Sequence, residues 1–382
     1  MNKNLHIMVI AGEASGDMRA GELVSAIKAI NPNIQFSGVG GECMQKAGVE
    51  LFENITSLAV IGIVEVLKNL GTIKKVFERV LFEAEAELPD AVILVDYPGF
   101  NLRLAAELKK RSIKVIYYIS PQVWAWREGR IEKIKKIVDR MIVLFPFEKE
   151  LYARHGMNVD YVGHPLVDEI DLIRDSALFS NEKYTHENRA LSLIKGATII
   201  GLLPGSRQKE VERHLPVMLE AAQKLYEEDN RRQFLLLKAP TIKKELLTSY
   251  IPANLPVKIF EGISYEGINA TSAVIVASGT ATLETALLNK PMVVIYKTSW
   301  ITYAIAKAVI KIPYIGLVNV VAGKKIVPEL IQNDCNAKQI AETVNTILKN
   351  KTMVEDLKNI KAALGLPGAS HRAAQVVLQE LI

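Results

Sequence analysis

The chain has 382 residues, of which 49% are hydrophobic and 23% are charged, and its net charge is +5. This length predicts about two domains, and the balance is typical of a folded protein with a sizeable core. A basic excess this small suits acidic ligands or an anionic membrane surface, and it does not indicate nucleic-acid binding. The two cysteines, Cys43 and Cys335, lie far apart without metal-ligand spacing, which favours a reducing cytoplasm. No apolar run approaches the ~20 residues of a membrane-spanning helix, and the first strand begins too early to leave room for a signal peptide.

The first predicted strand covers residues 5–11 and runs into the turn Gly12-Glu13-Ala14-Ser15-Gly16-Asp17, before a helix over about 18–30. A buried strand, a turn with glycines and a helix together indicate the first unit of a parallel α/β sheet. Ligands of such sheets gather at the carboxyl ends of the strands, so Glu13 is a candidate site residue. Alternatively, Glu13 or Asp17 caps the helix, and for Asp17 capping is the preferred interpretation.

A second strand over 35–39 ends in a glycine-rich run that departs from G-x-G-x-x-G, because Cys43 occupies the last position. This departure disfavours a nicotinamide site. Residues 57–88 have a helical pattern whose first part is unusually apolar and is followed by lysines and an arginine. Such a face is suited to a membrane surface or to acyl chains, and the alternative is a core helix on the sheet. Its candidate contact residues are Val60, Ile61 and Val64.

The strand over 91–95 delivers Asp96 to the same edge of the sheet, directly before a Tyr-Pro-Gly turn. A carboxylate at the end of a central strand is well placed to take a proton. The alternative role for Asp96 is to cap the helix that begins near Asn101. Together with Glu13, this placement predicts two carboxylates at one edge from separate strands.

Strands over 115–119 and 141–145 complete the first half, and the loop between them is rich in tryptophan. Trp124 and Trp126 in this loop are suited to stacking on a sugar ring or to meeting lipid. Arg127 opens a helix whose charge run is a solvated face or, at its start, a contact for an acceptor phosphate. The step Gly163-His164-Pro165 after the last strand predicts a crossover between domains, with His164 in the hinge rather than in catalysis.

The second half opens with a strand over 199–203 and the turn Pro204-Gly205-Ser206-Arg207, after which a helical pattern begins. Gly205 permits close backbone approach, and a helix N-terminus presents N–H groups that favour anions. Arg207 adds a planar donor fork that suits phosphate oxygens, so Gly205, Ser206 and Arg207 predict a pyrophosphate site. The turn is neither a Walker A loop nor the dinucleotide motif. Taken alone, it could also be an ordinary strand–helix turn with a surface arginine.

A second turn of this kind follows the strand over 273–277, with the sequence Ser278-Gly279-Thr280-Ala281-Thr282-Leu283-Glu284. Two such turns in one sheet can bracket a nucleotide, with the phosphates at one and the sugar at the other. Glu284 can accept both hydroxyls of a ribose diol, or it can simply stabilise the helix dipole. The nucleotide-binding candidates of this second part are Gly279, Thr280, Ala281 and Glu284, with Asn319 and Gln332 as polar tips after later apolar runs.

Five motifs together closely resemble the lipid A disaccharide synthase family over nearly the whole chain. They are 12–17, 120–126, 203–207, 278–284 and 327–332. The resemblance implies a GT-B fold, with Rossmann-like domains over 1–168 and 190–354 and a helix over about 355–382 that returns to the first domain. It also implies peripheral attachment to the cytoplasmic face of a bacterial inner membrane, without a metal or cofactor and with a homodimer as one option for assembly.

The implied reaction joins UDP-2,3-diacylglucosamine to 2,3-diacylglucosamine-1-phosphate (lipid X) and gives the β-1,6 lipid A disaccharide phosphate plus UDP, in lipopolysaccharide biosynthesis. An α-linked donor and a β-linked product require inversion, and we expect Asp96 to act as the base, with Glu13 orienting the acceptor or replacing it as base. Two other interpretations stay open at this stage. A sugar-nucleotide isomerase of the UDP-N-acetylglucosamine epimerase type would share the fold and both turns, and a non-catalytic nucleotide sensor or membrane scaffold would have no use for the two carboxylates.

Overall fold

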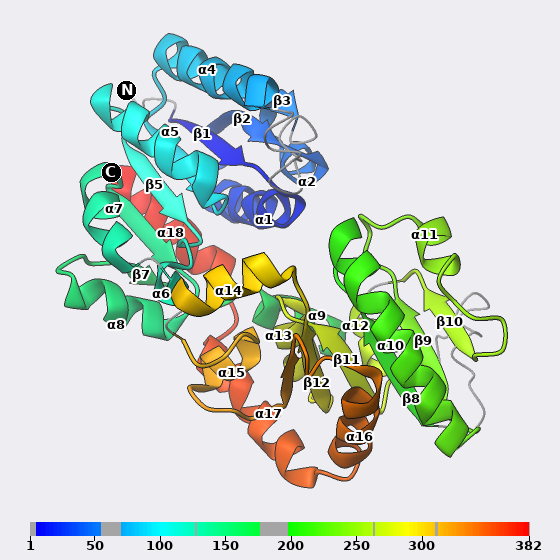
Figure 1. The fold of residues 1–382 in the computed structure, drawn as a ribbon. Helices are drawn as coiled ribbons and strands as arrows, with labels where there is room; N and C mark the ends of the chain where they lie inside the picture. The colour runs from blue at the N-terminus through cyan, green and yellow to red at the C-terminus, as the bar shows by residue number, and fades with distance from the viewer. Residues whose placement is uncertain are drawn as a thin grey trace. The chain divides into compact units, whose positions relative to one another are not determined.

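The computed structural model describes residues 5–54, 70–126, 128–175, 198–262, 264–309 and 312–381. The chain divides into two compact units, coloured along the chain in Figure 1. Unit 1 comprises Met1–Pro165 and Gly365–Ile382, and unit 2 comprises Leu166–Leu364. The chain therefore crosses between units at 165/166 and 364/365, where the sequence suggested about 168 and about 355.

Unit 1 contains a seven-stranded parallel sheet in the order β3-β2-β1-β4-β5-β6-β7. The central strands β4 and β5 are buried along their whole length, as expected for parallel strands covered on both faces. The strands are β1 (His6–Ala11), β2 (Gln35–Gly40), β3 (Glu50–Asn54), β4 (Ala91–Val95), β5 (Val115–Tyr118), β6 (Arg140–Val143) and β7 (Asp160–Tyr161).

Helices pack on this sheet because alternate strand residues point to opposite faces. Met8 and Leu94, for example, share one apolar cluster with Val80, Leu104 and Ile134, which come from three helices, α4, α5 and α7. Elsewhere in unit 1, α1 packs against α18, the last helix of the chain. The helices are α1 (Ala14–Ile30), α2 (Glu42–Lys46), α4 (Leu70–Glu87), α5 (Pro98–Lys110), α6 (Val123–Trp126), α7 (Ile131–Ile137), α8 (Pro146–Arg154) and α18 (Ala369–Leu381).

Unit 2 contains a six-stranded parallel sheet in the order β10-β9-β8-β11-β12-β13. Its strands are β8 (Ile199–Leu203), β9 (Gln233–Leu237), β10 (Val257–Phe260), β11 (Ala273–Ala277), β12 (Met292–Tyr296) and β13 (Glu329–Ile331). Its helices are α9 (Leu166–Asp175), α10 (Gln208–Glu228), α11 (Lys244–Thr248), α12 (Ser264–Asn269), α13 (Ala281–Leu287), α14 (Trp300–Val309), α15 (Leu317–Ala322), α16 (Ala337–Ile347) and α17 (Lys351–Leu364).

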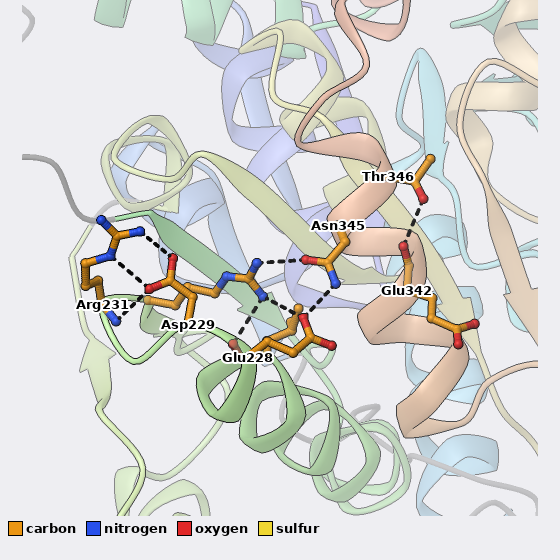
Figure 2. A network of polar contacts seen from close by, with 8 residues as sticks. Glu228, Asp229, Arg231, Glu342, Asn345 and Thr346 are labelled. Carbon is orange, nitrogen blue, oxygen red and sulfur yellow. Dashed lines mark hydrogen bonds and ion pairs between the residues drawn. The ribbon is translucent and has the colours of Figure 1, made fainter.

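The long helix α10 is fixed at its C-terminal end by a polar network with α16 (Figure 2). The guanidinium of Arg232 donates to Asn345 Oδ1 at 2.8 Å and pairs with the Glu228 carboxylate at 3.2 Å. The Asn345 amide in turn donates to Glu228 at 2.8 Å, so the three side chains form a closed set. The network therefore ties the end of α10 to α16 within unit 2.

Both sheets have a topological switch point, where the strand order reverses between neighbouring strands. In unit 1 the switch lies between β1 and β4, and in unit 2 it lies between β8 and β11. In open parallel sheets, ligands bind outside the carboxyl ends of the strands at this point. Four turns, one after each of these strands, therefore lie where such sheets bind ligands.

The elements differ from the sequence-based expectation in a few places. The strand β3 was not predicted, because its sequence Glu-Leu-Phe-Glu-Asn lacks a continuous apolar run. The tryptophan-rich segment expected to be a loop contains the short helix α6. The helix expected over 57–88 is described only from residue 70, as α4, and 55–69 lie outside the described residues. Among the described helices, none is both long and apolar enough to cross a membrane.

Candidate active site

The turn after β8 has the geometry that only glycine readily adopts. Gly205 has a φ of +122°, a region that side-chain-bearing residues rarely occupy. A Cβ at this position would also lie 2.6 Å from the carboxylate of Glu210 and 2.8 Å from its Cβ. The helix α10 then begins at Gln208, with Arg207 as its N-cap residue. The predicted strand, glycine turn and helix are thus all present.

The carboxylate of Glu210 accepts hydrogen bonds from the groups that the sequence analysis expected to bind a phosphate. Glu210 Oε2 accepts hydrogen bonds from the backbone N–H groups of Ser206 at 3.2 Å and Arg207 at 3.3 Å. Glu210 Oε1 pairs with the guanidinium of Arg207 at 3.2 Å. This is the reciprocal contact of a capping box, in which the third helical residue reaches back to the N-cap backbone. The N–H groups are therefore directed at an anionic group, but they are not free as the sequence-based interpretation assumed.

His214 links this turn to the end of a second strand. The buried ring donates from Nδ1 to the Pro204 carbonyl at 3.1 Å, and its Nε2 accepts from the backbone N–H of Lys297 at 3.1 Å. Burial lowers the pKa of His214, which keeps the ring neutral and able to make both contacts. Sequence reasoning missed His214 and Glu210. No sequence motif indicates Glu210, because the residue three positions before it is Arg207 rather than the Ser or Thr of a capping box.

The turn after β11 meets the first turn at the same edge of the sheet, because β8 and β11 are neighbours with Leu203 opposite Val276. The Ser278 hydroxyl donates to the Ile315 carbonyl at 2.9 Å, which fixes the start of the turn. The helix α13 begins at Ala281, with Thr280 at its N-cap. Glu284 lies half-buried in the first turn of this helix. Within unit 2, the structure thus brings Gly205–Arg207 and Gly279–Glu284 to one switch point.

Asn319 and Gln332, also predicted to bind the nucleotide, have their side chains engaged in local structure. The Asn319 Oδ1 accepts from the N–H groups of Ile326 and Val327, and its Nδ2 donates to the Val327 carbonyl and to Glu329 at 2.8 Å. Gln332 bonds the N–H and the carbonyl of Thr298. Both residues are buried, and these hydrogen bonds hold the loops around Val327 and Thr298, while their contact with the nucleotide stays a prediction.

In unit 1, Glu13 and Asp96 follow the two strands that flank the switch point, where Ala11 lies opposite Val95. Glu13 is exposed and occupies the N-cap position of α1 without making a side-chain cap hydrogen bond. Asp17 is buried, and its carboxylate accepts from the backbone N–H groups of Gly41, Cys43 and Met44 at 2.7–3.1 Å. Asp17 therefore caps a helix, as preferred, but the helix is α2 rather than its own.

Asp96 and Tyr97 both adopt the left-handed region, each with a φ of +47°. The helix α5 begins at Pro98 with Tyr97 at its N-cap, so it starts earlier than expected and Asp96 is not its N-cap residue. The Tyr97 ring lies so close to Gly12 that a Cβ there would be 2.3 Å from it. Burial, and then the charge of Glu13, raise the pKa of Tyr97, which indicates that the two turns are near one another.

The predicted acceptor and membrane residues are only partly described. Trp124 is half-buried on α6 and packs edge-on against Phe147, with 5.4 Å between ring centroids. This contact ties Trp124 to the unit 1 core. The side chain of Trp126 lies outside the described part of the chain, as do Arg127, Val60, Ile61 and Val64. Buried His164 lies next to the crossing at 165/166, and burial lowers its pKa to about 3, so the ring is neutral.

Solved structures with the same fold identify the class. The UDP-GlcNAc 2-epimerase of Neisseria meningitidis superposes with a TM-score of 0.67 at 12% identity, covering 98% of this chain and 100% of that one. The glycotransferase of kitacinnamycin superposes with a TM-score of 0.66 at 13% identity, with both chains covered completely. At such low identity these likenesses show the fold alone. Two parallel α/β sheets of this kind are the GT-B fold, as predicted from the sequence.

The sequence comparison narrows the class to one family. The model of the lipid-A-disaccharide synthetase family matches residues 7–378. The lipid-A-disaccharide synthase of Syntrophus aciditrophicus is 44% identical over 386 residues, which cover 99% of this chain and 98% of that protein. The chain belongs to this family, and it is a glycosyltransferase. The resemblance stated from the motifs is confirmed, and the epimerase and scaffold interpretations lose their basis.

Proposed function

We propose that this chain transfers a diacylglucosamine unit from UDP-2,3-diacylglucosamine to lipid X, forming a β-1,6-linked disaccharide phosphate and UDP. The observation that carries this proposal is family membership over nearly the whole chain, together with candidate residues at both switch points. Unit 2 supplies donors for an anionic leaving group, and unit 1 supplies carboxylates.

The nucleotide half of the proposal places the pyrophosphate at Gly205, Ser206 and Arg207. Negative charge builds up on UDP as the glycosidic bond breaks, and oriented N–H groups with a guanidinium stabilise that charge. Because Glu210 now occupies the same donors, the phosphate must replace its carboxylate there. Glu284 accepts hydrogen bonds from the ribose hydroxyls at the neighbouring turn, which also contains Gly279, Thr280 and Ala281.

The acceptor half of the proposal makes Asp96 the general base. Direct displacement at the anomeric carbon inverts its configuration, which converts an α-linked donor to a β-linked product without a covalent enzyme intermediate. The acceptor hydroxyl must then lose its proton as it attacks, and Asp96 at the end of a central strand accepts it. Glu13, on the adjacent strand, orients the acceptor. The reaction as proposed uses no metal or other cofactor.

The acyl chains of both substrates call for an apolar surface, which we assign to Val60, Ile61 and Val64, with Trp124, Trp126 and Arg127 near the acceptor. This assignment implies attachment to the cytoplasmic face of the inner membrane. Serine at the three aliphatic positions should weaken binding to vesicles of anionic phospholipid while UDP binding is kept. Unchanged vesicle binding would contradict the assignment.

One assay tests the reaction itself. The protein is incubated with UDP-2,3-diacylglucosamine, with and without lipid X, and the products are separated by chromatography and identified by mass. Disaccharide phosphate and UDP should form only when lipid X is present. Conversion of the UDP sugar to an epimer without lipid X would instead support an isomerase, and absence of both products would overturn the proposal.

A further inference from the structure

The backbone of Asp96 is anchored on both sides of its Cα atom. Its N–H donates to the carbonyl of Tyr118 at 3.0 Å. Its carbonyl accepts two hydrogen bonds, from the Tyr117 hydroxyl at 2.7 Å and from the Asn101 amide at 2.8 Å. A carbonyl oxygen has two lone pairs, so these two donors complete its acceptor capacity. With both peptide groups held, only the side-chain torsions of Asp96 can redirect its carboxylate.

The anchored conformation is one that the chain would not adopt without such contacts. Asp96 and Tyr97 are consecutive non-glycine residues with positive φ. Left-handed backbone is costly for residues with a Cβ and persists where the surroundings impose it, commonly at functional sites. The two donors act on the carbonyl between these residues. They therefore restrain the peptide group that joins the two residues, and with it the backbone torsions ψ of Asp96 and φ of Tyr97.

Both donors are wholly buried side chains aimed at this carbonyl. The Asn101 amide donates to the Asp96 carbonyl and also to the Val95 carbonyl at 3.1 Å, which fixes its orientation because carbonyl oxygens only accept. Within the described residues the Asn101 Oδ1 accepts no hydrogen bond, an unfavourable arrangement for a buried amide. Burial, and then the charge of Asp96, raise the pKa of Tyr117 well above its usual value, so its hydroxyl stays a donor.

We propose that Tyr117 and Asn101 are positioning residues that hold the Asp96–Tyr97 peptide in its left-handed conformation and so aim the Asp96 carboxylate at the acceptor hydroxyl. This inference rests on the proposed function, in which Asp96 is the base. Tyr117 comes from β5 and Asn101 from α5, so the neighbouring strand and the following helix both fix the direction of the base.

The test is Tyr117→Phe, which removes one hydroxyl and leaves the ring in the core. Its matched control is Tyr152→Phe, because Tyr152 is equally buried and its hydroxyl pairs with the Ser120 hydroxyl at 2.8 Å rather than with the Asp96 carbonyl. Tyr117→Phe should lower kcat on the order of tenfold with KM values unchanged, because a misaimed base slows proton transfer without affecting binding. The control should keep the parent kcat with a similar loss of thermal stability.

Two further measurements separate positioning from general packing. In an Asp96→Asn background, assayed by prolonged incubation with radiolabelled donor, Tyr117→Phe should have less than about twofold further effect, because coupled residues are not additive. Hydrogen exchange of the amides of 96–101 should rise in Tyr117→Phe and not in Tyr152→Phe. Equal kcat losses in both tyrosine variants, additive effects with Asp96→Asn, or unchanged exchange would each overturn the positioning role. If Asp96→Asn itself keeps full activity, the base assignment in the proposed function fails instead.

Discussion

The two units place their candidate residues at the same point of the same kind of sheet, but with opposite chemistry. In unit 1 the turns after β1 and β4 carry the carboxylates Glu13 and Asp96. In unit 2 the turns after β8 and β11 carry glycines, hydroxyls and Arg207. The comparison shows that the fold determines where a ligand can bind, while the turn residues determine what it is. Under the proposed function, unit 1 removes a proton and unit 2 binds the phosphates.

The units also share a second device, a glutamate that caps a helix after a strand. Glu148 caps α8 in unit 1 and Glu210 caps α10 in unit 2, each from the third helical position. Glu148 is buried, whereas the Glu210 side chain is 33% exposed and contacts Arg207. Under the proposed function, the same motif is purely structural in unit 1 and is displaced by the phosphate in unit 2. Four changes test this division between the units.

The largest effect is expected for Asp96→Asn. Loss of a general base should lower kcat by roughly 10²–10⁴-fold, while UDP affinity in unit 2 is unchanged. Steady-state kinetics and calorimetric titration with UDP measure the two quantities separately. The matched control is Asp90→Asn, because Asp90 lies just before the same strand and its carboxylate accepts from the His6 N–H. Near-normal kcat in Asp96→Asn, or weaker UDP binding, would contradict the assignment of the general base to Asp96 in unit 1.

Arg207→Ala should lower turnover by about a hundredfold or more, because removal of one donor to a developing oxyanion typically costs ~2.7–4 kcal/mol. UDP binding should weaken as well, in contrast to Asp96→Asn. Arg231→Ala, which removes an exposed guanidinium paired with Asp229 beyond the other end of α10, serves as control (Figure 2). Retention of near-full rate would remove Arg207 from the site.

The buried capping glutamate should make stability depend on pH. Burial raises the Glu148 pKa from 4.5 to about 8. Between these values the folded state holds a proton that the unfolded chain has released, so the free energy of unfolding falls as pH rises. Relative to Glu148→Gln, the parent should lose about 1.4 kcal/mol per pH unit in this window and no more above it.

Chemical denaturation of both proteins across that range, followed by a probe in unit 1, measures the difference. Glu150→Gln, at an exposed position of the same helix, should show the pH dependence of the parent. Parallel curves for the parent and Glu148→Gln would contradict the assignment of a buried, proton-holding carboxyl.

The smallest effect is expected for Glu210→Gln. The amide keeps a capping oxygen but removes the negative charge that competes with the phosphate, so UDP should bind about fivefold more tightly, from ~1 kcal/mol of lost repulsion in a solvated site. The control is Glu212→Gln, which removes the same charge two residues further along α10. The Glu212 carboxylate accepts from the Gln208 side chain rather than from the turn, so the UDP affinity should change less. Weaker UDP binding in Glu210→Gln would show that the carboxylate supports the bound state.

The sequence was sufficient for the central strands of both sheets and for the switch-point turns, because buried parallel strands are continuous apolar runs broken by glycine. The strand β3 was missed because Glu50, Glu53 and Asn54 interrupt its apolar pattern. The contacts that orient the candidates could not be predicted. The hydroxyl of Tyr117 and the ring of His214 act on backbone groups distant in sequence, and only the folded chain brings these partners together.

For the same reason, the sequence predicts the nucleotide contacts of Asn319 and Gln332 but not the local hydrogen bonds that these side chains make. A polar residue after an apolar run is compatible with a ligand and equally with a backbone carbonyl, and the sequence does not distinguish these partners. The structure shows that the loops around Val327 and Thr298 use them. Glu13 is the N-cap residue of α1 and makes no side-chain cap hydrogen bond, and Asp96 directly precedes Tyr97, the N-cap residue of α5.

A crystal structure with UDP tests most directly the claim that unit 2 binds the nucleotide while unit 1 supplies the base. The pyrophosphate should accept from the N–H groups of Ser206 and Arg207, the ribose should contact Glu284, and the Glu210 carboxylate should have moved off these amides. A nucleotide bound beside Glu13 and Asp96, with the Gly205 turn and Glu210 unchanged, would contradict the account.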